Sequence, residues 1–468
     1  MDRTPVTVIG GGLAGSEAAW QLAERGIPVR LLEMRPATSS PAHHGQDLAE
    51  LVCSNSFKSV DPETAPGMLK RELEAMGSFV MRTARASAVP AGGALAVDRA
   101  AFSAAITSTL ARHPLVELVR EEAARLPPGD VIVATGPLTS SAFEPALAAL
   151  LGEKRLAFFD AAAPIVDAST VDLSVAFAAS RYGKGGGADY LNCPLDRGAY
   201  EALIDALVSA DRVTAKEFET SDLFQACQPV EEVARRGLDA LRFGALKPVG
   251  LTDPHTGERP WAVVQLRPEN RDATAFNLVG FQTNLTFGEQ RRVFRTIPGL
   301  ERAEFLRYGV MHRNTFVDAP RLLTPTLAVR SEPRVRIAGQ LAGTEGYLEA
   351  AGGGIVAALD VAASRGAMKL PALPQTTALG ALLAYASDPE VVDYQPMHVN
   401  FGLLPVLEPL VRNKRRRHAT LSERADRDLV RWLAALPRPL APIGGHTTLE
   451  RSSVHGSESP MPSGNSAR

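Results

Sequence analysis

Five residues able to bind metals or act as nucleophiles stand out in the chain: His43, His44, Cys53, Cys193 and Cys227. No C-x-x-C pair occurs and the spacing of the first three matches no zinc pattern, so we expect no metal site. Cys193 lies in an apolar stretch, and a cysteine in such company is usually inert. Cys53 and Cys227 have polar neighbours, where exposure and thiolate character are favoured. We therefore expect Cys193 to be dispensable, whereas these residues alone leave Cys53 and Cys227 open as either reactive thiols or inert buried cysteines.

A basic run lies near the C-terminal end, where Arg412–His418 reads RNKRRRH and carries five formal positive charges. Such a run is by default a solvated helix face. In a chain with a formal net charge of −2 it is equally a candidate contact for a phosphate backbone. The sequence leaves both interpretations open.

The composition is that of a soluble globular protein, with 468 residues, 45% hydrophobic residues and three cysteines. This length is enough for two or three domains. No apolar run is long enough to span a membrane, and the N-terminus shows no signal-peptide layout. We expect a cytoplasmic protein with reduced thiols and no membrane contact.

The first 35 residues read as a βαβ unit that can hold a dinucleotide. A strand at Val6–Ile9 is followed by Gly10, Gly11, Gly12, Leu13, Ala14 and Gly15, then by a helical pattern over Ser16–Arg25 and a strand at Val29–Leu32. Glycines at these positions allow a tight turn, close approach of the backbone to a pyrophosphate, and packing of helix on strand. Glu33 ends the second strand, where a carboxylate accepts hydrogen bonds from ribose hydroxyls. The pattern predicts dinucleotide binding.

Two later segments favour FAD as the dinucleotide. Val131–Gly136 reads as a strand that ends in Ala-Thr-Gly, and Val335–Gln340 reads as a strand and loop that include Gly339. Gly352, Gly353 and Gly354 then precede a helical stretch at Ile355–Ala363 and are expected to bring a second glycine-rich backbone to the flavin. The predicted fold class is α/β, a glutathione-reductase-type FAD-binding Rossmann domain with an inserted α/β substrate domain. The predicted boundaries are 1–165 and 310–440 for the FAD-binding domain, 166–309 for the insertion and 441–468 for a disordered tail.

Several sequence blocks resemble the folate- and FAD-dependent tRNA uracil-5-methyltransferase family (TrmFO). They include LLEMRPATSSPAHHGQDLAELVCSNSFKS, DYLNCPLDR, CQPVEEVARRG, NLVGFQTNL, YGVMHRNTF, GQLAGTEGYLEAAGGG and QPMHVNFGLLP, in the family's order. The chain departs from the family pattern at Gln225 and Ala226, where Glu-Gly is expected before the cysteine. A role for a carboxylate at that position is therefore not carried over.

The resemblance implies formation of 5-methyluridine in the T loop of tRNA. It also implies FAD, 5,10-methylenetetrahydrofolate as the carbon donor, and NADH or NADPH as the reductant. A thiolate that adds to C6 of uracil makes C5 nucleophilic, and a base must later remove the C5 proton. We expect Cys227 to attack C6 and Cys53 to remove the proton, with the reverse order as the alternative. Tyr347 is a candidate to stack on a planar ring, and His312, Arg313 and Asn314 are candidates to line the folate and flavin pocket.

Three other interpretations remain open. The related GidA/MnmG flavoproteins modify wobble uridines with FAD and folate, but they carry a long C-terminal helical region for a partner GTPase. This chain ends soon after the basic run, so we expect no obligatory protein partner. A non-catalytic, dinucleotide-sensing RNA-binding protein would bind flavin without folate turnover. An S-adenosylmethionine methyltransferase would purify colourless.

Overall fold

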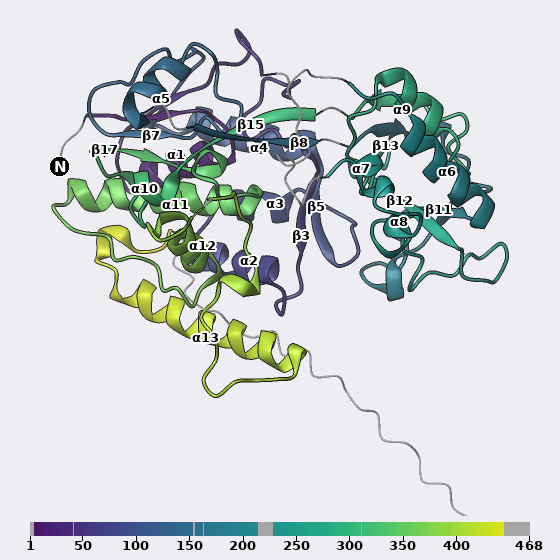
Figure 1. Cartoon of the computed structure of the whole chain (residues 1–468). Helices are drawn as coiled ribbons and strands as arrows, with labels where there is room; N and C mark the ends of the chain where they lie inside the picture. Colours follow the sequence, from purple (N-terminus) through teal and green to yellow (C-terminus); the bar gives the residue numbers. More distant parts are fainter. Residues whose placement is uncertain are drawn as a thin grey trace, which may run out of the picture.

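The computed structural model of the chain describes residues 4–40, 42–152, 155–161, 163–213, 228–309, 311–392 and 394–443. Two groups of elements lie side by side, each around its own hydrophobic core (Figure 1). The larger group combines the N-terminal and C-terminal parts of the chain, and the smaller group comes from the middle. Cys227 lies outside the described residues, as does the predicted disordered tail apart from 441–443.

The larger group is built on a six-stranded sheet with the strand order β16-β17-β7-β1-β2-β6. Five strands run parallel, and β16 at the edge pairs antiparallel with β17. The strands are β1 (Val6–Ile9), β2 (Val29–Leu32), β6 (Val116–Val119), β7 (Val131–Val133), β16 (Ala328–Val329) and β17 (Glu332–Ile337). The predicted Rossmann-type α/β arrangement is confirmed, because the two ends of the chain supply neighbouring strands of one parallel sheet.

Helices α1 (Leu13–Ala23) and α11 (Tyr347–Arg365) pack against each other beside this sheet (Figure 1). The prediction that a helix begins at Ile355 is wrong, because α11 begins eight residues earlier and contains Gly352–Gly354 in its interior. Glycine inside a helix costs about 0.5–1 kcal/mol relative to alanine. Close packing requires it here, since a Cβ at Gly354 would lie 2.3 Å from the carbonyl oxygen of Ala14.

The smaller group is a second six-stranded sheet with the order β10-β11-β12-β13-β9-β14. Every pairing between these described strands is antiparallel. The strands are β9 (Ile165–Asp167), β10 (Phe177–Ala178), β11 (Leu191–Leu195), β12 (Ala262–Pro268), β13 (Ala275–Leu278) and β14 (Phe305–Arg307). The helices are α6 (Arg197–Ser209), α7 (Val230–Arg235), α8 (Ala240–Phe243) and α9 (Phe287–Phe294). An antiparallel pair of strands, β8 (Arg155–Ala161) and β15 (Met311–Val317), connects the two groups.

The remaining elements surround the larger sheet or pack on the helices beside it, as α13 does on α2. A three-stranded sheet contains β3 (Ser56–Ser59), β4 (Ala88–Val89) and β5 (Ala94–Val97). The helices are α2 (Ala65–Ala75), α3 (Phe79–Ala86), α4 (Arg99–Arg112), α5 (Glu144–Leu151), α10 (Ala319–Leu322), α12 (Ala378–Ser387) and α13 (Lys414–Ala435). Within the described ranges, no helix combines the length and the apolar character that a membrane crossing requires.

Candidate active site

The glycine-rich turn between β1 and α1 has the geometry of a dinucleotide site. Gly10 has φ +101°, and a Cβ there would lie 2.5 Å from the carbonyl oxygen of Ala134. A Cβ at Gly15 would lie 1.8 Å from the carbonyl oxygen of Gly10. A Cβ at Gly12 would meet no described atom within 4 Å, so this backbone faces open space. Gly10 and Gly15 are therefore required by the fold itself, whereas Gly12 leaves room for a ligand that approaches the backbone.

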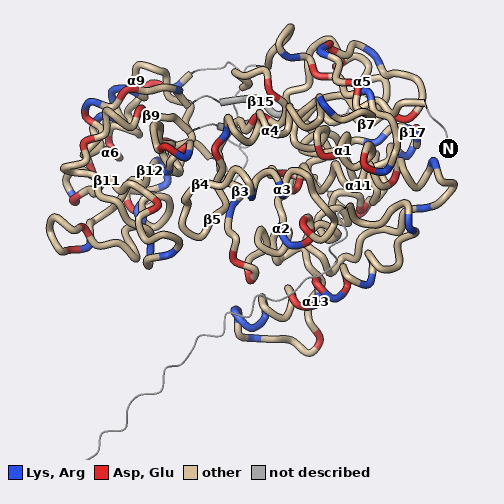
Figure 2. The backbone as a smooth tube through the Cα atoms, turned by 180° about the vertical axis from the view of Figure 1, so that it is seen from behind, with Lys and Arg blue, Asp and Glu red and all other residues tan. Residues whose placement is uncertain are grey.

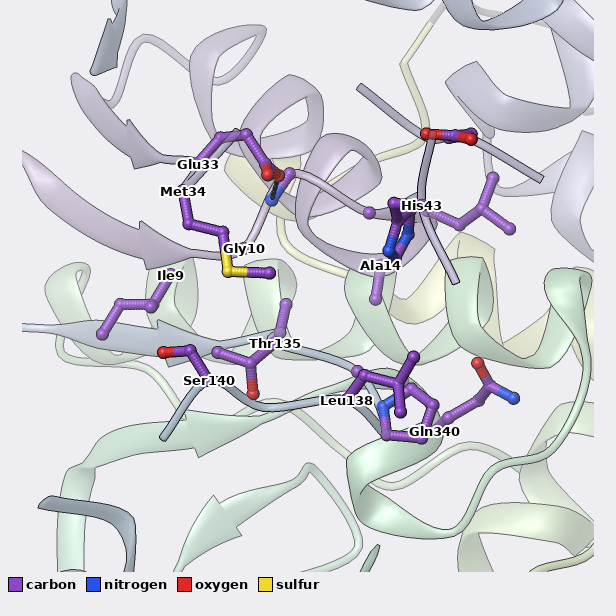
Figure 3. Close-up of a pocket in the computed structure, with 18 of the residues that line it drawn as sticks. Ile9, Gly10, Ala14, Glu33, Met34, His43, Thr135, Leu138, Ser140 and Gln340 are labelled. Carbon is purple, nitrogen blue, oxygen red and sulfur yellow. Dashed lines mark hydrogen bonds between the residues drawn. The ribbon is translucent and has the colours of Figure 1, made fainter. Parts of the chain in front are cut away.

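A cleft runs along this turn, with side chains from both ends of the chain around it (Figure 3). The predicted site residues that line it are Gly10, Gly11, Gly12, Leu13, Ala14, Glu33, Cys53, Gly339 and Tyr347. His43, rejected above as a metal ligand, also lines the cleft, as do Thr135 and Gln340 from the two segments that favour FAD. Further lining residues, which sequence reasoning missed, include Met34, Arg35, Glu50, Leu138 and Ser140. Gly15 and Gly352–Gly354 do not line the cleft and are instead packed between helices and strand.

Glu33 is a fixed, buried carboxylate at the end of β2. Its Oε2 accepts a hydrogen bond from the backbone N–H of Gly11 at 2.9 Å, and its Oε1 accepts one from Nε of Arg35 at 2.8 Å. Arg35 also pairs with Glu50 at 2.9 Å. Burial acts to raise the pKa of Glu33, but the hydrogen bonds and charge of Arg35 outweigh it, and the pKa is lowered. An ionised carboxylate is therefore held at the position where the fingerprint predicts a ribose contact.

The backbone around Cys53 is held by Tyr347, the first residue of α11. The Tyr347 hydroxyl accepts hydrogen bonds from the backbone N–H groups of Cys53 at 3.0 Å and Ser54 at 3.1 Å. Burial, and after it the charge of Cys53, raise the pKa of Tyr347, so its hydroxyl stays protonated. The residue predicted to stack on a planar ring thus also fixes the loop that carries the thiol.

Three arginines from different elements surround the same loop, and the sequence analysis identified none of them. Arg99 donates to the carbonyl oxygens of Leu51 and Val52 and pairs with the carboxylate of Glu269. Arg307 also donates to the carbonyl oxygen of Val52. Burial, and after it the charge of Arg99, lower the pKa of Arg307. Arg267, the third of these arginines, contacts the residues that follow Cys53.

Arg267 donates from Nε to Asn55 Oδ1 and from Nη2 to Ser54 Oγ, both at 2.7 Å. Asn55 is fully buried and donates to the carbonyl oxygens of Val97 and Pro268. The polar residues after Cys53 are therefore occupied in holding the loop against β12. Arg99 pairs with Glu269, whose charge also acts on Arg267 and Arg307. A setting with more cations than carboxylates is typical of reactive cysteines.

Cys53 also lines a second cleft, which lies between the loop that it occupies and the segment 398–401. Tyr347 and Gln340 line both clefts, so the two spaces meet beside the thiol. Polar and aromatic lining residues of the second cleft include Lys58, Glu349, His398, Asn400, Phe401 and His418. Burial lowers the pKa of His398, which favours its neutral form at pH 7.

The other residues that the sequence analysis named are Cys193, the histidine pair considered for metal binding, and the candidates for the folate pocket. Cys193 is fully buried in β11, and burial raises the pKa of its thiol, as expected for an inert cysteine. His43 Nδ1 lies 2.6 Å from Ser40 Oγ, and burial lowers its pKa. In the part of the chain that the structure describes, no group of three or more His, Cys, Asp or Glu residues is placed to hold a metal ion. The side chains of His312, Arg313 and Asn314 lie outside the described part.

The basic run forms the exposed N-terminal end of α13 (Figure 2). Asn413 caps the helix by accepting a hydrogen bond from the backbone N–H of Arg416 at 3.0 Å. Cations are unfavourable at a helix N-terminus, and the first turn contains no acidic residue. Arg415 forms an exposed ion pair with Glu63 at 3.4 Å. Lys184, in the segment between β10 and β11, lines the same surface pocket as Lys414 and Arg415.

The fold and the glycine-rich cleft define a Rossmann-type dinucleotide-binding protein with an inserted antiparallel sheet. The family model "Glucose inhibited division protein A" (GidA) matches residues 5–369. A solved structure of GidA from Aquifex aeolicus has a TM-score of 0.65 at 18% identity, covering 92% of this chain and 76% of that one.

Relatives named methylenetetrahydrofolate--tRNA-(uracil-5-)-methyltransferase TrmFO are more similar in sequence. The Pelobacter propionicus protein is 54% identical, over 95% of this chain and 98% of the relative. The Thermosynechococcus vestitus protein is 54% identical, over 94% and 96%. The chain belongs to the GidA family and, within it, to the TrmFO group.

Proposed function

We propose that this protein is a folate- and FAD-dependent tRNA methyltransferase that forms 5-methyluridine in the T loop of tRNA. The observation that carries the proposal is the position of Cys53, which lines both the dinucleotide cleft and the adjoining second cleft. Similarity at 54% identity to relatives with this name favours it over the wobble-uridine alternative, since GidA is similar at 18%.

FAD fits the dinucleotide cleft. The open space at Gly12 and the backbone N–H groups at the N-terminus of α1 would hold the pyrophosphate, and Glu33 would bind the ribose. Gly339, with φ +78° and a Cβ position 2.9 Å from Ala14 Cβ, keeps the two ends of the chain close together around the cofactor. Reduced FAD supplies the hydride that brings a formaldehyde-level carbon to a methyl group.

The thiols carry the chemistry on uracil. Cys227 adds to C6, which places negative charge on C5 and its conjugated carbonyl and makes C5 nucleophilic. After the carbon is attached, Cys53 removes the C5 proton and tetrahydrofolate leaves as its amine. Addition of a hydride to that carbon then completes the methyl group and expels the Cys227 thiolate from C6; the reverse assignment of the two thiols is the alternative. Tyr347 and Arg267 act as positioning residues, because they hold the backbone and the polar neighbours of Cys53.

The second cleft is our proposed site for methylenetetrahydrofolate. Its lining combines Lys58, a cation suited to the carboxylates of the folate tail, with the polar groups of His398 and Asn400. NADH or NADPH is the proposed reductant of the flavin. Residues 166–309 are the proposed substrate domain, and the basic end of α13 is a proposed phosphate contact for tRNA.

The proposal is tested with unmodified tRNA, methylenetetrahydrofolate and a reduced nicotinamide, followed by nucleoside analysis. 5-Methyluridine at the T-loop position is expected. A tRNA with 5-fluorouridine at that position separates the thiol roles, because fluorine cannot leave as a proton and the covalent adduct is trapped. C227A should abolish the trapped adduct, whereas C53A should abolish turnover and keep the adduct.

The matched control is C193A, which should retain methylation because its thiol is buried away from both clefts. Adduct lost in C53A and retained in C227A would reverse the two roles. Methylation retained in both C53A and C227A would contradict the thiol mechanism.

A further inference from the structure

A stack of three aromatic rings reaches the surface of the inserted sheet at its contact with the Cys53 loop. Phe287 at the start of α9 stacks on Tyr308 with ring centroids 4.8 Å apart and planes at 18°. Tyr308 stacks in turn on Phe305, at 5.3 Å and 15°. Phe287 is 54% exposed, although one face of its ring stacks on the ring of Tyr308. An exposed ring that is fixed in orientation is a platform on which a further planar group can stack.

This platform borders a cavity of about 650 Å³ between the two groups of elements. The opposite wall is formed by the segment 44–51 and by Arg99. Arg307 lies next to the platform in the chain, lines the cavity and donates to the carbonyl oxygen beside Cys53. The cavity and the dinucleotide cleft therefore lie on two sides of the same loop, with Glu50 lining both.

The aromatic platform favours a ligand with a planar group, and the arginines near it favour one that also carries a negative charge. Arg291 donates from Nε and Nη2 to the Tyr308 hydroxyl, at 3.1 and 2.8 Å, at the edge of the platform. Arg292 pairs with Glu289 at 2.5 Å, whereas the described residues offer Arg291 no carboxylate partner. Nε of Arg307 is buried and has no hydrogen-bond acceptor within the described part.

Among the described residues, two carboxylates line the cavity, Glu50 and Asp47, and the charge of Glu50 is compensated. Glu50 pairs with Arg35 and also accepts hydrogen bonds from the backbone N–H groups of His44 and Gly45. Asp47 is the second carboxylate on the wall of the cavity. Of the two described arginines that line the cavity, Arg99 pairs with Glu269, which lies outside the lining.

We propose that the Phe287–Tyr308 platform stacks a base of the tRNA adjacent to the target uridine, with Arg291 against its phosphate. The inference rests on the proposed function and names the surface that would hold the substrate beside Cys53. A flipped uridine leaves the stack of its neighbours, and an aromatic surface replaces the stacking that the neighbouring base loses. The stacked rings and the guanidinium together match a nucleotide rather than an apolar peptide.

The test uses the full-length, FAD-loaded protein and a T-arm hairpin RNA with 2-aminopurine on either side of the target uridine. Stacking on an aromatic ring should quench the fluorescence of the probe at one of the two positions. F287A should lose this quenching and bind the hairpin about tenfold more weakly, and F287W should retain both. The matched control is F243A, which removes a phenylalanine that is 76% exposed on the same sheet assembly, away from the cavity.

Arg291 is tested in the same assay. R291Q should weaken binding and reduce the slope of log Kd against log salt by about one, whereas R292Q should change neither. Quenching and affinity that are unchanged in F287A would overturn the proposal. So would an F287A variant with normal hairpin affinity and a raised KM for methylenetetrahydrofolate, because the cavity would then hold the folate. A wild-type protein that forms no 5-methyluridine in tRNA would instead refute the proposed function itself.

Discussion

Replacing Gly12 by valine separates the cofactor site from the fold. The backbone at Gly12 has φ −70° and ψ −169°, an extended conformation that any residue adopts. Its Cβ would meet no described atom within 4 Å, so the valine side chain projects into the cleft and not into the protein. We expect G12V to fold, to purify without FAD and to be colourless, because the pyrophosphate cannot approach the backbone.

The expected loss of stability in G12V follows from the linkage between FAD binding and folding. FAD at about 100 times its Kd stabilises the wild type by about 2.7 kcal/mol, and this gain should be absent in G12V. The free energies of unfolding of the two apoproteins should agree within about 0.5 kcal/mol. The control G15A places a Cβ 1.8 Å from the carbonyl oxygen of Gly10, and should lose at least about 1–3 kcal/mol even without FAD.

The measurements are the visible absorbance of released flavin and denaturant unfolding with and without added FAD. Stoichiometric FAD in purified G12V would refute the placement of the pyrophosphate. An apoprotein of G12V as unstable as that of G15A would refute the argument that Gly12 faces open space.

Two further predictions concern tRNA binding and pH. The double variant R415E/R416E should weaken tRNA binding and reduce its salt slope by about two, with normal flavin content. The control R431E, at the exposed C-terminal end of α13, should leave tRNA affinity and the salt slope unchanged. An unaltered salt slope in the double variant would show that the basic run is only a solvated helix face. Burial raises the pKa of Glu72 from 4.5 to about 7, so the folded state binds this proton more tightly than the unfolded state. The free energy of unfolding is therefore highest below about pH 4.5, and this contribution is lost as the pH rises through 7. Denaturant unfolding should show the wild type losing about 3 kcal/mol relative to E72Q between about pH 4 and about pH 8, and a pH-independent difference would contradict this.

The sequence by itself determined the dinucleotide site, because the features that form it are local. A β-branched run, glycines at fixed spacing and an acidic residue at the end of the next strand are each read within a few residues of one another. Gly10, Gly12 and Glu33 accordingly line one cleft, and their contact with a dinucleotide stays a prediction. That segments from both ends of the chain form one cofactor domain could also be predicted from their apolar strand runs, and the structure places β17 beside β7 and β7 beside β1 in one parallel sheet.

The start of α11 could not be predicted, because three consecutive glycines have low helix propensity and read as a loop. Only the approach of α1 to within van der Waals distance explains why Gly354 lacks a side chain. Local propensity was overruled here by packing.

The surroundings of Cys53 were decided by the tertiary structure alone. Arg99 begins a helix of the larger group, whereas Arg267 and Arg307 belong to separate strands of the inserted sheet. Their one sequence signal was Arg267, a cation within the otherwise largely apolar strand Ala262–Pro268. Side chains this far apart in the chain converge only because β8 and β15 bring the inserted sheet against the Cys53 loop, where buried guanidinium groups need the carbonyl oxygens of Leu51 and Val52 as acceptors.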